Sequence, residues 1–237
     1  CIGRNGVLAT VNSGAVVGVD ALRVEIEVNA AGGDVTKIVT VGLPDAAVKE
    51  SCDRVWTAMG NSALTPAWGR TTINLAPANI RKEGPIYDLP IALAMCAAMG
   101  DVPREAVEDV CMVGELALSG EVRKVRGVLP MALMARKEGL RRMIVPAANA
   151  PEAAVVEDLD VIPVATLREA VDYLAGDRDI APLRLELDEV FSGGARFEVD
   201  LSDVKGQEFA RRAMEVAVAG GHNLLMLSNK VTRSRSW

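Results

Sequence analysis

Apolar and polar residues alternate through the first forty residues of the chain, and a period of two is typical of β-strands. Segment 7–42 is rich in Val, Ile and Thr, and turn-forming residues fall at 12–14 and at 31–34. The pattern predicts three strands in antiparallel order.

After residue 43 the apolar residues recur with the period of a helix. Pro44 and Asp45 supply a helix start, and apolar residues follow at helical spacing as far as Gly60. A strand is predicted over 70–75 and a loop over 76–87. Asp88 is expected to cap a further helix, whose apolar side would carry Leu89, Ala92, Leu93 and Cys96.

Strand and helix patterns alternate in the next block, which favours a βαβ-like arrangement. Strands are predicted over 110–116, 122–125, 143–145 and 161–164, with a turn at 119–120. Helices are predicted over 129–138 and 151–156 and, behind a capping box of Thr166 and Glu169, as far as Leu174. Residues 176–200 combine Gly, Pro and mixed charge without periodicity, as linkers do.

A helical run, Glu208 to Ala219, precedes an apolar stretch at 224–227 that reads as a buried parallel strand. In a P-loop ATPase such a strand leads into a glycine-rich phosphate cradle that ends in Gly-Lys-Ser/Thr. The residues after 227 contain no such cradle. We therefore expect this chain not to hydrolyse ATP by itself.

The amino-acid composition argues against several classes of function. The net charge of −6 leaves no overall basic footprint for nucleic acid, so any such contact needs a local patch. Four scattered cysteines without a Cys-x-x-Cys pair argue against a zinc site or disulfides and favour a cytoplasmic location. A single histidine, His222, excludes Ser-His-Asp and Cys-His catalysis within the chain. No apolar run is long enough for a membrane span.

Four segments in order resemble the C-terminal domain of Lon protease, and so imply a mixed α/β sheet of the Lon-C-like, ribosomal-protein-S5-domain-2-like fold. They are loop 81–88, hairpin 113–122, helix 129–139 and strand 143–146, followed by Asn149. That domain uses a Ser-Lys dyad, but the matching positions hold Ile86 and Leu129. Aliphatic side chains can neither attack a carbonyl nor accept a proton, so no catalytic residue is expected. Ser119 and Lys124 are the nearest nominal replacements.

Nearly the whole chain resembles the ComM/YifB family of magnesium-chelatase-like proteins. The resemblance rests on seven short strings, at 41–45 (VGLPD), 74–78 (NLAPA), 81–85 (RKEGP), 88–93 (DLPIAL), 114–116 (GEL), 126–130 (RGVLP) and 145–146 (VP). It implies a hexameric AAA+ ATPase that uses ATP and Mg²⁺ and acts on branched or single-stranded DNA, as in branch migration during natural transformation.

Two other readings stay open. One is the ATPase subunit of a true magnesium chelatase, although that subunit has no Lon-like domain in front of its ATPase module. The other is a protein-interaction module with no role on DNA. RadA-type recombination proteins also carry a Lon-like domain, but it follows their ATPase core.

The resemblance also implies a domain division. Residues 1–6 would be an extension, 7–175 the Lon-C-like domain, 176–200 a linker, 201–227 the start of an AAA+ module, and 228–237 a tail outside the family pattern. We expect no metal site in the chain.

Two sets of binding residues are predicted. Val204, Lys205 and Gly206 occupy the segment with which AAA+ proteins commonly grip adenine. Arg70, Arg81 and Lys82 are candidates for contact with DNA phosphates, and loop 81–88 before a helix could assist with its N–H groups. A plain tight turn with solvated cations is the alternative reading of that loop.

Overall fold

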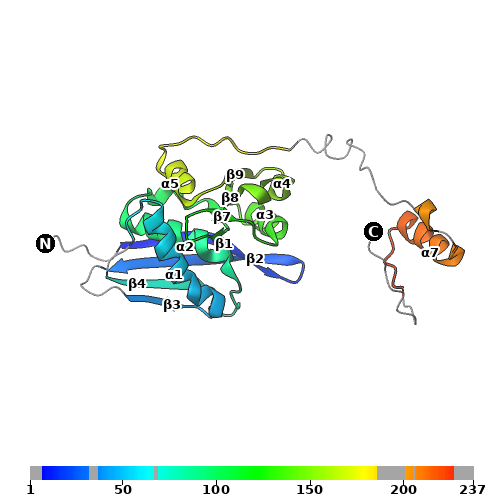
Figure 1. The fold of residues 1–237 in the computed structure, drawn as a ribbon, viewed down its shortest axis with the longest axis horizontal. Coiled ribbons are helices and arrows are strands. Elements are labelled where there is room, and N and C mark those ends of the chain that lie inside the picture. The colour runs from blue at the N-terminus through cyan, green and yellow to red at the C-terminus, as the bar shows by residue number, and fades with distance from the viewer. Residues whose placement is uncertain (1–6, 32–36, 67–68, 186–200, 205, 227–237) are drawn as a thin grey trace. The chain divides into compact units, whose positions relative to one another are not determined.

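A computed structural model describes residues 7–31, 37–66, 69–185, 201–204 and 206–226 (Figure 1). The chain forms two compact units, residues 1–187 and residues 188–237.

The first unit is built on one seven-stranded sheet with the order β3-β4-β2-β1-β5-β8-β9. Its strands are β1 (Val7–Val17), β2 (Asp20–Ala31), β3 (Lys37–Val41), β4 (Arg70–Ala76), β5 (Val110–Met112), β8 (Arg142–Pro146) and β9 (Asp160–Val164). The pairs β1–β2 and β2–β4 are antiparallel and the other four are parallel. This mixed sheet confirms the predicted α/β fold class. A separate hairpin pairs β6 (Glu115–Leu116) with β7 (Val122–Arg123).

The predicted turn at residues 12–14 is wrong, because β1 runs straight through it. The Asn12 side chain donates to the Glu108 carbonyl at 2.9 Å and accepts from Arg23 at 3.0 Å, so this polar residue is satisfied inside the sheet. The chain turns instead at Gly18, whose φ of 65° suits a two-residue hairpin loop. The three predicted strands are also not consecutive neighbours, since β4 lies between β2 and β3.

The helices packed on the sheet are α1 (Ala46–Asn61), α2 (Asp88–Met99), α3 (Val128–Lys137), α4 (Ala150–Ala153) and α5 (Leu167–Ala175), with short 3₁₀ turns η1 (Pro85–Tyr87), η2 (Arg104–Ala106) and η3 (Ala147–Asn149). Helices α1, α2 and α5 cover one face of the sheet, and α3 and α4 cover the other face near β5, β8 and β9 (Figure 1). The predicted one-sided helix at Asp88 is in fact buried all round from Asp88 to Ala98, because α2 packs between β1 and β2 on one side and α1 and α5 on the other. None of the helices within the described ranges has the length and apolar character that a membrane span needs.

Two hydrophobic cores result from the alternation of side chains along the strands. In β8, Ile144 belongs to the core under α1, α2 and α5, whereas Met143 and Val145 belong to the core under α3 and α4. The capping box before α5 forms as predicted, with the Glu169 N–H donating to Thr166 Oγ1 at 3.2 Å.

The first unit continues past Ala175, where the sequence predicted the linker to begin. The Leu183 N–H donates to the Val161 carbonyl at 2.8 Å, and Arg184 pairs with Asp160 at 3.3 Å. The predicted linker residues after 185 and the predicted extension and tail lie outside the described residues.

The second unit contains η4 (Leu201–Asp203) and α7 (Glu208–Ala219), which confirms the predicted helical run. The predicted buried strand at its end is not formed over residues 224–226, which are exposed and carry no strand pairing. A buried strand needs neighbours to pair with, and the described residues of this unit provide none.

Candidate functional site

A pocket of about 450 Å³ opens where β1, the loop before α2 and the segment after β7 meet. Its lining consists of Gly14, Ala15, Val16, Arg81, Glu83, Gly84, Pro85, Ile86, Tyr87, Glu115, Lys124, Val125 and Arg126. The pocket thus joins residues of two of the four segments with the Lon-like pattern, loop 81–88 and, through Glu115, hairpin 113–122.

Ile86 lines the pocket at the position where a Lon-type serine is expected. Leu129, at the position of the lysine, is not among the lining residues, and its N–H donates to Glu152 at 3.1 Å. Lys124 does line the pocket, but Ser119 lies exposed in the turn of the β6–β7 hairpin and does not. Ser119 and Lys124 therefore do not meet as a dyad at this pocket.

Other nucleophiles among the described residues are poorly placed for chemistry. Cys52, Cys96 and Cys111 are buried, and burial raises the pKa of each thiol, to about 12 for Cys96 and Cys111. Thiols with such a high pKa are protonated at neutral pH and are weak nucleophiles. None of these three cysteines lines the pocket.

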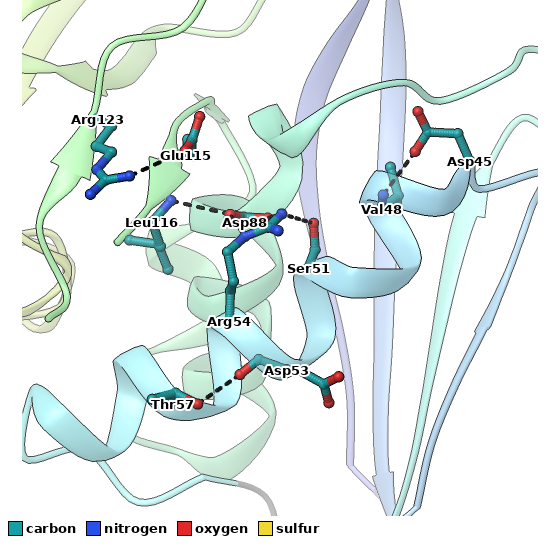
Figure 2. Close-up of polar contacts among 10 residues, drawn as sticks. All are labelled: Asp45, Val48, Ser51, Asp53, Arg54, Thr57, Asp88, Glu115, Leu116 and Arg123. Carbon is teal, nitrogen blue, oxygen red and sulfur yellow. Dashed lines mark hydrogen bonds and ion pairs between the residues drawn. The ribbon is translucent and has the colours of Figure 1, made fainter. Parts of the chain in front are cut away.

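Asp88 anchors the loop that forms one wall of the pocket (Figure 2). Its carboxylate is fully buried and receives Arg54 Nε at 2.9 Å and Nη2 at 3.2 Å. The Leu116 N–H also donates to it at 3.2 Å, and Arg54 Nη2 reaches Ser51 Oγ at 3.1 Å. The expected capping role of Asp88 is thus wrong, since no side-chain cap bond forms at the start of α2 and the carboxylate ties α1, α2 and β6 together.

Asp45 holds the same loop from the other side. One carboxylate oxygen caps α1 by accepting from the Val48 N–H at 2.8 Å, as the sequence predicted for this helix start. The second oxygen accepts from the Gly84 N–H at 3.1 Å. The Gly84 amide is therefore already used, which weakens the idea that this loop holds an anion with its N–H groups.

Asn149 fixes the opposite wall of the pocket. It is fully buried, and its side-chain amide accepts from the Val125 N–H and donates to the Val125 carbonyl, both at 2.9 Å. It also donates to Glu152 at 3.1 Å. Because Val125 lies between Lys124 and Arg126, this one amide determines where both cations stand.

Replacing Asn149 with aspartate is expected to lower the free energy of unfolding by about 2–3 kcal/mol, since the buried Val125 carbonyl and the half-buried Glu152 lose their donor. A carboxylate can still accept from the Val125 N–H, but it faces the Val125 carbonyl and Glu152 without a proton. Urea unfolding followed by circular dichroism measures the loss. Adding Glu152→Gln should restore part of it, and equal stability of the single variant and the parent would contradict this role.

Lys124 and Arg126 are exposed at the pocket, and within the described ranges neither has a hydrogen-bond or ion-pair partner. The other charges of the lining are paired. Arg81 lies 3.3 Å from Glu83, and Glu115 lies 3.7 Å from Arg123 of β7. The pocket thus has an unneutralised positive side at residues 124–126. Sequence reasoning missed it because it considered Lys124 only as a dyad replacement and Arg126 only as part of the string RGVLP.

The three cations predicted for DNA do not cluster. Arg70 is exposed at the start of β4, and Arg81 is exposed beyond its other end, about 20 Å away along a seven-residue strand. The Lys82 side chain is buried and donates to the Pro77 carbonyl, and burial lowers its pKa. Lys82 is therefore not presented to a phosphate, which corrects its proposed surface role.

The predicted nucleotide segment is only partly described. Val204 is half-buried and Gly206 is exposed with a φ of 75°, while Lys205 lies outside the described residues. The helix that follows opens with Glu208, whose carboxylate disfavours a phosphate at that terminus. The described part of the chain also brings no three His, Cys, Asp or Glu residues together as a metal site.

Comparison with known families places two matches on the chain. Residues 25–149 match the family described as subunit ChlI of Mg-chelatase, and residues 200–231 match the family described as magnesium chelatase, subunit ChlI.

Three relatives illustrate the range of similar proteins. Competence protein ComM of Haemophilus influenzae is 39% identical over 222 residues, which are 93% of this chain and 43% of ComM. Protein YifB of Escherichia coli is 38% identical over 221 residues, 93% of this chain and 42% of YifB. DNA repair protein RadA of Bacillus subtilis is 34% identical over 92 residues, 39% of this chain and 20% of RadA. The chain spans about two fifths of the length of ComM and YifB.

Proposed function

The chain belongs to the Mg-chelatase ChlI family, with ComM and YifB among its relatives, and from this premise we propose that it is the non-catalytic N-terminal region of a ComM-like AAA+ ATPase that acts on single-stranded or branched DNA. In this proposal the first unit engages DNA or organises the assembly, and the ATPase module does the work.

The observation that carries the proposal is the pocket with Ile86 in the place of a nucleophile. A peptidase-like frame without its dyad retains a shaped surface but no hydrolytic chemistry. The printed names of ComM and RadA, a competence protein and a DNA repair protein, point to DNA as the material on which such a domain works.

The full-length parent would bind ATP and Mg²⁺ in its AAA+ module, to which residues 201–227 belong in this proposal. It would assemble as a ring, place six copies of the first unit side by side, and work in the cytoplasm. With a net charge of −6, one copy should bind DNA weakly, whereas six repeated patches can add modest contacts through avidity.

The test is fluorescence anisotropy with labelled forked DNA and single-stranded DNA between 50 and 200 mM salt, values chosen to cover about the range in which phosphate contacts respond. The chain should bind weakly and without sequence preference, and increasing salt should abolish binding. Arg70→Ala with Arg81→Ala should weaken binding and flatten the salt dependence by about 0.7 per lost contact to a single strand.

Arg136→Ala is the matched control, because Arg136 is an exposed cation in the last turn of α3 and has no assigned role. It should leave the salt slope unchanged. If the double variant binds like the parent, Arg70 and Arg81 are not the contact residues. If the parent chain binds neither substrate at the lowest salt, the DNA role of this region fails and the interaction-module reading gains.

A further inference from the structure

β1 is paired on both sides only at Asn12, in the middle of the strand. Its register with β2 covers Val7 to Val17, whereas its pairing with β5 is confined to Asn12 opposite Cys111. Beyond Asn12, β1 runs along the pocket and its second edge faces the pocket with Gly14, Ala15 and Val16. Within the described residues no strand pairs with this edge, which is exposed at Val16 and buried at Gly14 and Ala15.

The hairpin turn determines which backbone groups point to that edge. Val17 pairs with Asp20 across a two-residue turn, so these two residues form the closing hydrogen-bonded pair. Hydrogen-bonded and non-hydrogen-bonded pairs alternate along antiparallel strands. Gly14 and Val16 therefore direct their N–H and C=O groups away from β2, as Asn12 does where it meets β5.

This edge thus has one donor and one acceptor at the exposed Val16 and a second pair at the buried Gly14. No partner outside β2 is found for Gly14 or Val16 in the part of the chain that the structure describes. The groups repeat about every 7 Å, the spacing of every second residue in an extended strand. An incoming extended peptide matches this pattern of donors and acceptors.

The walls of the pocket indicate which side chains such a peptide carries. Pro85, Ile86 and Val125 offer apolar contact, and Lys124 and Arg126 offer positive charge that no described residue neutralises. A strand places alternate side chains on opposite faces. A peptide in which apolar and acidic residues alternate would therefore address both features at once.

A nucleic-acid strand fits the same surface less well. Phosphodiesters supply acceptors only, so the outward carbonyls of Gly14 and Val16 would lose water without gaining a donor. Tyr87, the one aromatic residue of the lining, is buried and offers no platform for a base.

We propose that this pocket is a peptide-docking site, in which an extended acidic segment of another protein adds to the free edge of β1 and places its carboxylates against Lys124 and Arg126. This function goes beyond the proposed DNA engagement by Arg70 and Arg81, and of those two cations only Arg81 also lines the pocket. Peptide docking would be a binding role for a peptidase-like fold, and it requires no nucleophile.

The probe is the fluorescein-labelled peptide Ac-Thr-Val-Asp-Val-Asp-Val, followed by anisotropy with the whole chain. Its counterpart with lysine in place of both aspartates should bind at least about tenfold more weakly, as expected when charge-assisted bonds are replaced by repulsion. Lys124→Ala with Arg126→Ala should weaken binding of the acidic peptide about tenfold.

Val16→Pro tests the strand edge directly, because proline removes the outward N–H and leaves the bonds to β2 in place. It should reduce affinity about fivefold, the order expected for one lost hydrogen bond with hindrance of its neighbour. Val16→Ala, which keeps the N–H, should bind within about twofold of the parent. Circular dichroism confirms that each variant folds.

Three results would overturn the proposal. One is equal binding of the acidic and basic peptides. Another is unchanged binding in the Lys124 and Arg126 double variant, which tests the site even if Val16→Pro does not fold. The third concerns labelled dT₁₂, which would have to displace the peptide and bind more tightly than it does. If binding of dT₁₂ depends on Lys124 and Arg126 but not on Val16, the pocket is a nucleic-acid surface.

Discussion

Replacing Asp88 with alanine is expected to lower the free energy of unfolding by about 3–5 kcal/mol, the range for removing one partner of a buried ion pair. The change leaves the Arg54 guanidinium and the Leu116 N–H without their common acceptor. Because this carboxylate joins α1, α2 and β6, the pocket wall at Ile86 should also loosen. Chemical unfolding measures the first effect, and faster hydrogen exchange at the Gly114 amide, which donates to Ile86 at 3.0 Å, measures the second.

Asp172→Ala provides the matched control for Asp88→Ala. Asp172 pairs with Arg168 at 2.7 Å, a shorter distance than any within the Asp88 cluster, but both side chains are partly exposed on α5. Surface pairs of this kind contribute at most about 1 kcal/mol, because water solvates each charge when the pair is broken. If both variants lose the same stability, burial is not what makes Asp88 important.

The sequence predicted the elements of the first unit better than their contacts. Strand and helix patterns gave β4, β8, β9, α1, α3 and α5 close to their observed bounds, since these signals are local. The pairing partners of β3 and the straight course of β1 through residues 12–14 depend on residues far away in the chain, such as Glu108 and Arg23. No local signal at 12–14 could have shown that Asn12 would be satisfied within the sheet.

At the candidate site, too, the sequence did not predict the surroundings of the charged residues. Arg81 and Lys82 are adjacent in sequence, yet one is exposed and the other buried. Lys124 and Arg126 drew no attention as a pair, because their significance comes from Asn149 and from the unpaired edge of β1. Burial and neighbours across the fold decide whether a cation can meet a ligand.

The structure explains the physical roles of several residues in the family strings. In the string VGLPD, Asp45 caps α1 and holds Gly84, and Gly42 occupies a point where the backbone after β3 comes against β4. In GEL, the Gly114 N–H donates to Ile86 and the Leu116 N–H to Asp88. The strings VGLPD and GEL therefore both contact the loop before α2, which itself contains the string RKEGP.

Replacing Gly42 with alanine should also be strongly destabilising, by about 3 kcal/mol, because strain at a left-handed position and overpacking each cost 1–3 kcal/mol. Gly42 has a φ of 98°, and a Cβ there would stand 2.1 Å from the Leu75 carbonyl oxygen. The obstacle is backbone of β4, which cannot move without disturbing the β3–β4 pairing. Urea unfolding of the purified variant measures the loss.

Substitutions at two further glycines distinguish backbone strain from overpacking. Gly139 has a φ of 78° but no atom within 4 Å of a Cβ, so Gly139→Ala should show the strain alone, about 1 kcal/mol. Gly60 lies in α1 with neither obstacle, and Gly60→Ala should stabilise the chain by about 0.5 kcal/mol through the better helix propensity of alanine. If Gly42→Ala costs no more than Gly139→Ala, β4 yields to the added methyl group, and the close approach of Gly42 to β4 is not what requires glycine in this string.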